Sequence, residues 1–120
     1  MNRETPSSGR REPRVATRLS GEILGRAPQA VGVFDLSRSG CLVSTEKRLA
    51  PDAVHDVRFD LADGELVVKA RVVESSIDGA SLQDGTASYL SGMRFLDLRP
   101  HDEQRLLRYL SQNTQRLRED

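Results

Sequence analysis

The sequence predicts an antiparallel β-barrel or β-sandwich followed by one C-terminal helix. Short segments in which apolar and polar residues alternate recur between Val15 and Leu96, and turn-favouring residues separate them. Helical spacing of leucines begins only after Pro100. Six strands with no helical pattern between them are typical of an antiparallel sheet that closes or packs on itself.

The predicted strands cover residues 15–19, 30–37, 40–45, 54–61, 65–75 and 87–96. The clearest pattern is in the fourth, where Val57, Phe59 and Leu61 alternate with polar residues, as in a sheet with one face in water. The turn 62–64 after it contains Gly64 and predicts a hairpin. Residues 1–9 are polar, offer nothing to bury, and are expected to form a disordered tail. The domain is therefore predicted to span residues 10–120, with the barrel over about 14–98.

One amphipathic helix is predicted over about residues 100–117. Pro100 suits the first helical turn, and Asp102 and Glu103 lie where the helix dipole favours acids. The apolar stripe consists of Leu106, Leu110 and Leu117, with Leu107 adjoining. Because a helix this short is stabilised by packing, the stripe is expected to cover an opening of the barrel; a partner-binding helix is the alternative.

Composition excludes several classes of protein. The 120 residues suffice for one domain, and the apolar runs are far too short for a membrane span. The N-terminus lacks the apolar stretch of a signal peptide and Cys41 has no second cysteine to pair with, so a reduced, cytoplasmic protein is expected. Cys41, His55 and His101 lack metal-ligand spacing, and no metal site is predicted.

The net charge of zero conceals an uneven distribution of charge. Arginine supplies 16 of the 18 basic residues. Residues 1–20 carry a net charge of +3, whereas residues 46–80 carry −3. An anion is therefore expected to approach the N-terminal end, unless that end is simply a solvated tail.

Two short motifs carry functional chemistry. In the segment from Arg10 to Arg14, Pro13 disfavours helix, so these two arginines are expected on one side of an extended chain, at most about 13 Å apart. The second motif, Asp35-Leu36-Ser37-Arg38-Ser39-Gly40, lies between two predicted strands. Alone, the second motif also fits an ordinary turn in which the Asp and Ser side chains cap backbone amides and the glycine supplies a positive φ.

Together and in this order, the motifs resemble those of the PilZ domain family. The resemblance covers roughly residues 10–112 and includes the flanking segments RVATRLSGEIL, GVFDLSRSGCLV and SGMRFLDLRPHDEQRLLRYL. It implies a six-stranded antiparallel barrel with a C-terminal helix, and it implies cyclic di-GMP as the ligand. The RxxxR motif corresponds to Arg10 and Arg14, and the (D/N)xSxxG motif to Asp35, Ser37 and Gly40. Arg11 and Arg38 adjoin these positions and are second-rank candidates.

The chemistry of the implied ligand explains these residue types. An arginine can donate a forked pair of hydrogen bonds to guanine O6 and N7 or contact a phosphate. The Asp35 carboxylate can accept from guanine N1–H and the exocyclic amine, and Ser37 can add a donor or an acceptor. Gly40 lacks a Cβ, which allows close backbone approach at the turn.

The resemblance predicts a stand-alone receptor whose N-terminal loop closes over cyclic di-GMP and that signals to a downstream protein, which the sequence does not identify. The protein is expected to need no cofactor and no metal, to bind no nucleic-acid polymer, and not to insert into a membrane. A PilZ-like interaction module that does not bind the nucleotide, as in some type IV pilus proteins, is the main alternative. An enzyme using Cys41 is disfavoured because a cysteine on a strand is usually buried. Single-stranded nucleic acid binding is disfavoured because aromatics are few and Phe34, Phe59 and Phe95 are expected on core faces.

Overall fold

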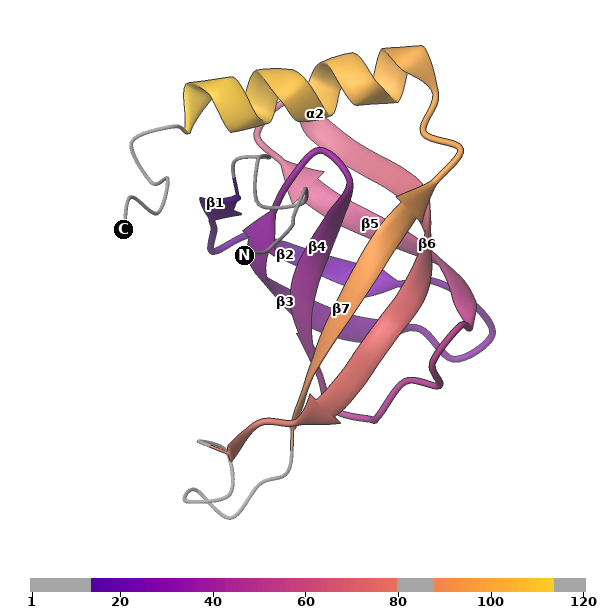
Figure 1. Cartoon of the computed structure of the whole chain (residues 1–120). Helices are drawn as coiled ribbons and strands as arrows, with labels where there is room; N and C mark the ends of the chain where they lie inside the picture. The colour runs from indigo at the N-terminus through magenta and orange to yellow at the C-terminus, as the bar shows by residue number, and fades with distance from the viewer. Residues whose placement is uncertain (1–13, 80–87, 114–120) are drawn as a thin grey trace, which may run out of the picture.

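The chain forms a closed six-stranded antiparallel barrel with one additional short strand and a C-terminal helix across one end (Figure 1). This computed structural model describes residues 14–79 and 88–113. The predicted tail over residues 1–9, together with Arg10 and Arg11, lies outside the described residues. The barrel and the helix agree with the fold that the sequence predicts.

The strands are β1 (Val15–Ala16), β2 (Ser20–Ile23), β3 (Gln29–Leu36), β4 (Gly40–Thr45), β5 (Val54–Leu61), β6 (Gly64–Ile77) and β7 (Tyr89–Leu96), and the helix is α2 (Pro100–Gln112). Around the barrel the strand order is β3-β2-β5-β6-β7-β4, and β4 pairs with β3 to close the ring. Every pairing is antiparallel. Closure leaves the six barrel strands without a free edge, and β1 adds to β3 beside them.

The barrel interior is filled by the residues that the alternation placed inward. On β5, Val57 and Phe59 are fully buried and Leu61 nearly so. Phe59 meets the half-buried Phe95 of β7 edge to face, with ring centroids 5.9 Å apart. Burial of these apolar side chains is the main stabilising term of the fold.

Helix α2 covers one open end of the barrel, as predicted (Figure 1). Leu106 and Leu110 join the core, whereas Leu107 faces solvent. Pro100 begins the helix, with Asp102 and Glu103 in its first turn. The helix ends at Gln112, earlier than predicted, and Leu117 lies outside the described residues.

Side-chain hydrogen bonds fix α2 to two separate parts of the barrel. Arg105 donates to the carbonyl oxygens of Gly64 and Glu65 and pairs with Asp63 at 2.9 Å, which clamps the β5–β6 turn. The Tyr109 hydroxyl donates to Thr17 Oγ1 at 2.9 Å, just after β1. The helix therefore contacts the chain three residues after Arg14.

The first predicted strand, residues 15–19, is wrong in extent. Within this range only the two residues of β1 form a strand, and a separate strand β2, which the sequence prediction missed, begins at Ser20. Gly21 obscured β2, because glycine weakens a strand pattern. In the structure this glycine is needed, since a Cβ there would overlap the Arg58 carbonyl oxygen of β5.

The prediction that all three phenylalanines face the core is also wrong for Phe34, which is 48% exposed. Val31 and Val33 point inward, so alternation along β3 directs Phe34 outward. A register shift between Val33 and Asp35 then leaves Phe34 without a partner on β4. This β-bulge returns Leu36 to the core.

Candidate functional site

The two sequence motifs meet on the outside of the barrel. Strand β1 pairs with the end of β3, with Ala16 opposite Asp35, and this places Arg14 beside the carboxylate. Arg14 Nη2 donates to Asp35 Oδ1 at 3.1 Å. The Arg14 side chain is 54% exposed and the Asp35 side chain 23%, so both groups remain open to a ligand.

Arg14 lies between two surface hollows. The first has a volume of about 300 Å³ and is lined by Arg14, Ala16, Thr17, Phe34, Asp35 and Leu42. The second, of about 240 Å³, extends over β4, β6 and β7 and is lined by Arg14, Ser37, Ser39, Gly40, Cys41, Val73, Gly92, Met93 and Arg94. A guanidinium shared by two hollows can contact two parts of one ligand.

Ser37 shapes the turn between β3 and β4. Its side chain is buried, and its Oγ accepts from the backbone N–H groups of Ser39 at 3.3 Å and Gly40 at 3.2 Å. The Ser37 N–H donates to the Gly40 carbonyl at 2.9 Å. Ser37 therefore follows the ordinary-turn interpretation, whereas the Asp35 carboxylate faces Arg14.

Gly40 is required by close packing between strands. The φ of Gly40 is not positive, in contrast to the ordinary-turn interpretation of this glycine. Strand β4 passes so close to β7 that a Cβ on Gly40 would overlap the Met93 carbonyl oxygen. The glycine thus permits the close backbone approach expected of it, and the approaching backbone is that of β7.

Arg38 is directed to α2. Its Nε lies 3.1 Å from Glu103 Oε2, and the residue lines neither hollow. The Ser39 carbonyl accepts from the Phe95 N–H at 2.8 Å, which ties the turn to β7 as well. Arg10 and Arg11 lie outside the described residues, so of the four predicted arginines only Arg14 and Arg38 are placed by the structure.

Residues that sequence reasoning did not select also line the hollows. Phe34 and Leu42 contribute apolar surface to the first. Arg94 contributes a second guanidinium to the second. Strand alternation could have indicated that Phe34 faces outward, because the valines at positions 31 and 33 point inward. Arg94 lies in the flanking segment that carried the resemblance, but only the register Gly40↔Arg94 shows that it neighbours the turn.

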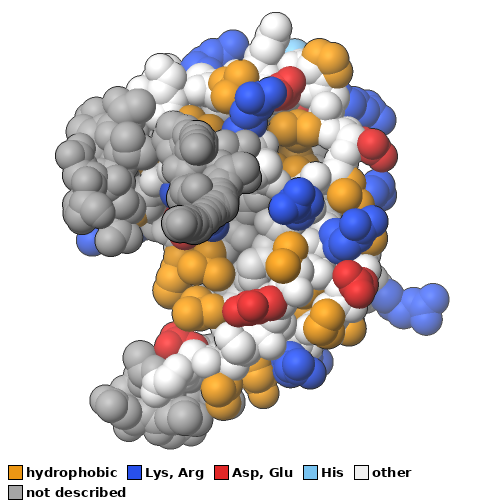
Figure 2. Space-filling view, in the orientation of Figure 1, with side chains coloured by type: hydrophobic (Ala, Val, Ile, Leu, Met, Phe, Trp, Pro, Cys, Tyr) orange, Lys and Arg blue, Asp and Glu red, His pale blue; other side chains and the backbone are white. Residues whose placement is uncertain are grey.

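On the face of the molecule drawn in Figure 2, basic and acidic side chains intermingle, with hydrophobic side chains between them. The local field also acts on Cys41, whose thiol is buried beneath the site. The pKa of Cys41 is raised to about 12, mainly by burial and to a smaller extent by the Asp35 carboxylate, while Arg14 acts to lower it. Since the thiolate is the nucleophilic form, Cys41 behaves as a small apolar core residue.

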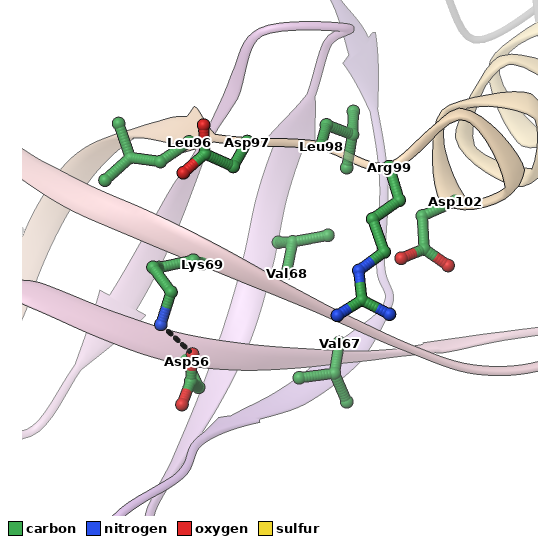
Figure 3. A pocket seen from close by; sticks show the side chains of 9 residues that line it. All are labelled: Asp56, Val67, Val68, Lys69, Leu96, Asp97, Leu98, Arg99 and Asp102. Atoms are coloured by element: carbon green, nitrogen blue, oxygen red, sulfur yellow. Dashed lines mark hydrogen bonds and ion pairs between the residues drawn. The ribbon is translucent and has the colours of Figure 1, made fainter.

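A larger hollow of about 520 Å³ lies elsewhere, between β6 and the segment that leads into α2 (Figure 3). Val67, Val68, Leu96 and Leu98 supply its apolar lining, and Lys69, Arg99, Asp56, Asp97 and Asp102 supply its charged lining. Lys69 is paired with Asp56 at 3.1 Å. Three carboxylates against two basic groups suit a dianion poorly, so the volume of this hollow does not make it the better candidate.

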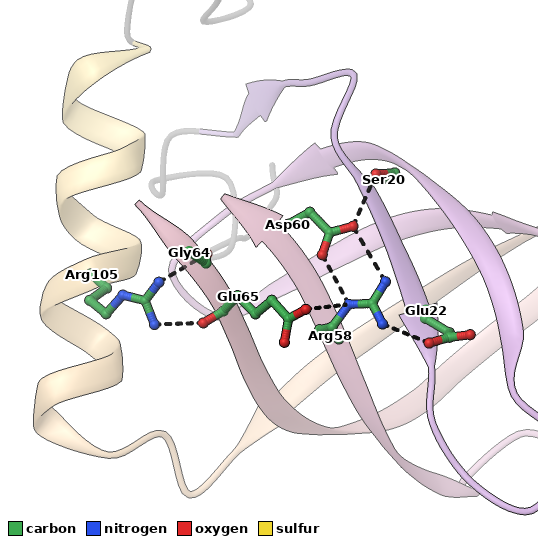
Figure 4. A network of polar contacts seen from close by, with 7 residues as sticks. All are labelled: Ser20, Glu22, Arg58, Asp60, Gly64, Glu65 and Arg105. Carbon is green, nitrogen blue, oxygen red and sulfur yellow. Dashed lines mark hydrogen bonds and ion pairs between the residues drawn. The ribbon is translucent and has the colours of Figure 1, made fainter. Parts of the chain in front are cut away.

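A third polar feature lies on the outer face of β2 and β5 (Figure 4). Arg58 donates to Glu22 at 2.7 Å and to Asp60 at 2.9 Å, and Ser20 donates to Asp60 at 3.1 Å. The hydrogen bonds between Arg58 and Asp60 raise the pKa of Arg58 and lower the pKa of Asp60. The Glu22 and Asp60 carboxylates both accept hydrogen bonds from the Arg58 guanidinium, which is typical of a structural network.

Across residues 14–79 and 88–113, no group of three His, Cys, Asp or Glu side chains is placed to hold a metal ion. Nor does that part of the chain contain a helix with the length and apolar character needed to cross a membrane.

Comparison with known proteins identifies the class to which this barrel belongs. The model of the PilZ domain family matches residues 8–112, nearly the whole chain. The protein belongs to the PilZ family. A comparison with curated proteins finds no match.

Solved structures show the same fold at low sequence identity. The PilZ domain with c-di-GMP of YcgR from Escherichia coli is 17% identical with a TM-score of 0.72, and the match covers 90% of this chain and 93% of that one. The K. pneumonia MrkH–c-di-GMP complex is 19% identical with a TM-score of 0.70, over 84% and 50% of the chains. The Bacillus subtilis inhibitor of motility, MotI/DgrA, is 16% identical with a TM-score of 0.75, over 96% and 53%. The protein spans about half the length of the last two.

Proposed function

We propose that this protein is a receptor for cyclic di-GMP and that Arg14 and Asp35 form the centre of its binding site. The observation that supports this function is the meeting of the two motifs. Residues 21 positions apart lie 3.1 Å from each other between two hollows on one face. Membership of the PilZ family supports the choice of ligand, as do the c-di-GMP complexes of YcgR and MrkH.

The chemistry of the pair fits a guanine-bearing dianion. The Arg14 guanidinium can donate two parallel hydrogen bonds to guanine O6 and N7, or contact a phosphate. The Asp35 carboxylate can accept from N1–H and the exocyclic amine, donors that a phosphate does not offer. In the free protein the two side chains hold each other in place, and ligand binding exchanges this exposed ion pair for charge-assisted bonds.

The other candidate residues receive different roles. Arg10 and Arg11 would bring further guanidinium groups from the segment before β1 to the phosphates or bases. Ser37 and Gly40 set the path of the turn, through the bonds to Ser37 Oγ and the close approach to β7. Arg38 would contact the ligand only by leaving Glu103.

The function is tested by calorimetric titration of cyclic di-GMP into the wild type, with cyclic di-AMP and GTP as competing ligands. We expect saturable binding that favours cyclic di-GMP. Asp35→Ala should reduce the preference over cyclic di-AMP, because adenine has neither the N1–H nor the C2 amine from which the carboxylate accepts in guanine. A wild type that binds none of the three would refute the proposed function.

Binding is proposed to change the N-terminal loop and thereby signal to a protein partner. Arg38, within the second motif, pairs with Glu103 of α2, and Thr17, three residues after Arg14, bonds to Tyr109 of the same helix. Ligand-bound Arg10 and Arg14 would draw the loop against the barrel, an order–disorder type of switch. Hydrogen exchange at residues 8–15 should slow at saturating cyclic di-GMP, and unchanged exchange would exclude this mechanism.

An interaction module that does not bind the nucleotide is the second candidate. The structural likeness to an inhibitor of motility fits this alternative. This alternative predicts no heat of binding with cyclic di-GMP in the same titration. The Arg14–Asp35 pair favours the receptor, because a pure docking surface does not need those two groups together.

A further inference from the structure

One feature of the first hollow is not explained by either motif: an aromatic ring exposed beside the charged pair. Phe34 is 48% exposed, whereas Phe59 is fully buried and Phe95 packs against it. A single exposed apolar side chain is common on protein surfaces and means little by itself. Its place on the same side as Asp35, however, results from a specific irregularity in β3.

The β-bulge places two consecutive side chains in one hollow. In a regular strand, neighbouring side chains point to opposite faces, so Phe34 and Asp35 would be separated by the sheet. The register shift between Val33 and Asp35 removes this alternation, and both side chains line the same hollow of about 300 Å³. Bulges commonly redirect side chains next to functional sites.

The hollow then offers three kinds of contact suited to one flat heteroaromatic group. Arg14 donates, Asp35 accepts, and Phe34 supplies an apolar π face, with Leu42 adding apolar surface. The volume lies at the small end of ligand pockets, which suits one base better than a complete dinucleotide. The second hollow, across Arg14, leaves room for the remainder of the ligand.

Building on the proposed function, we infer that Phe34 is the stacking surface for one guanine of cyclic di-GMP, while Arg14 and Asp35 bind the edge of that base. The Asp35 carboxylate selects guanine over other bases, and the Phe34 ring adds affinity that does not depend on which base is stacked on it. Stacking on an aromatic side chain contributes about 1–3 kcal/mol per base, which corresponds to roughly a 5- to 150-fold effect on Kd.

The first test replaces the ring by an aliphatic side chain. Phe34→Leu keeps an apolar group at an exposed position, and its thermal unfolding should match the wild type. We expect its Kd for cyclic di-GMP to rise by roughly 5- to 150-fold. Phe34→Tyr retains the π face and should bind within about threefold of the wild type. Equal Kd values for Phe34→Leu and the wild type would overturn the inference.

The second test uses the absence of tryptophan from the sequence. Phe34→Trp introduces a single indole at the bulge, and a stacked guanine should quench its fluorescence on saturation. Val54→Trp is the matched control, since Val54 is 46% exposed on β5 and lines neither hollow. Quenching at position 34 but not at position 54 is expected, and unchanged or equal signals at both positions would contradict stacking.

Failure of this inference and failure of the proposed function give different results. If the wild type binds and Arg14→Ala loses affinity while Phe34→Leu binds normally, the receptor function stands and the stacking role of Phe34 falls. If the wild type shows no binding, the proposed function itself fails, and the stacking role fails with it.

Discussion

At the scale of single residues, the Arg14–Asp35 pair combines proximity with exposure. Exposed ion pairs contribute little to folding stability, because solvent screens them and both side chains lose rotamer freedom. The folded protein therefore loses little stability when a ligand replaces the contact between Arg14 and Asp35. Cys41, directly beneath, differs from the pair because it has no access to solvent.

Cys41 should be inert in the folded protein. Burial raises the pKa of its thiol to about 12, so the thiolate is scarce at neutral pH and the sulfur is covered. A thiol reagent such as dithionitrobenzoate should label Cys41 only after unfolding in urea. Fast labelling of the native protein at pH 7 would show that the site opens to solvent.

Sequence reasoning identified the residues of the pair but not their surroundings. The RxxxR and DxSxxG spacings selected Arg14 and Asp35, and strand pairing brought them together. Phe34 was assigned to the core because a phenylalanine in a strand is usually buried. Alternation along β3 directs Phe34 outward, whereas the bulge that brings Asp35 to the same side depends on pairing with β4, a tertiary property that local alternation does not encode.

At the scale of elements, the β3–β4 turn is held from several sides. Its own hydrogen bonds run through Ser37, and it is anchored to β7 through Ser39 and to α2 through Arg38. The glycine at its end is what allows β4 to approach β7. The second motif is therefore as much a packing device as a candidate binding motif.

A pair of glycine substitutions tests this role. Gly40→Ala should lower the free energy of unfolding by about 1–3 kcal/mol, because the added methyl group overlaps the Met93 carbonyl oxygen. Gly92→Ala is the matched control on β7, where a Cβ meets nothing within 4 Å, and it should change stability by less than about 0.5 kcal/mol. Urea unfolding measures both, and equal losses would show that the close approach is not limiting.

Predictability differed between elements for a physical reason. The strands over 40–45 and 54–61 were predicted with their observed bounds, because their inward residues alternate regularly. Strand β2 was missed because Gly21, which allows the close backbone approach to β5, has no side chain to contribute to an alternating pattern. The helix was predicted from its leucines, and its end depends on capping by Asn113, which gives no apolar signal.

At the scale of the whole molecule, α2 closes one end of the barrel and joins distant parts of the chain. Its ion pair with Arg38 reaches the second motif, its bond to Thr17 lies three residues after Arg14, and Arg105 clamps the β5–β6 turn. A change at the candidate site can therefore be transmitted to α2 through two separate contacts. The exposed Leu107 places an apolar group on the outer side of this helix.

The Arg105 clamp predicts how stability depends on pH. The hydrogen bond from Arg105 lowers the pKa of Asp63, so its carboxylate stabilises the fold above its unfolded pKa. That contribution is lost as the pH falls through the lower, folded pKa. The melting temperature of the wild type should therefore fall more steeply between about pH 5 and pH 2 than that of Asp63→Asn.

The control for this comparison is Glu46→Gln. Glu46 is exposed, and its side chain has no ion pair with any residue the structure describes. Its acid-range profile should parallel that of the wild type. If the melting temperature of Asp63→Asn fell as steeply with pH as that of the wild type, the clamp would not contribute to the stability of the barrel.

The most direct test of the account compares two arginines of the same segment by calorimetric titration with cyclic di-GMP. Arg14 contacts Asp35 between the two hollows, whereas Arg18 is exposed and lines neither. Charge-assisted hydrogen bonds contribute about 1.5–3 kcal/mol, so Arg14→Ala should raise Kd at least about tenfold and Arg18→Ala by less than about twofold. Equal effects of the two substitutions, or no binding by the wild type, would contradict a ligand site centred on Arg14 and Asp35.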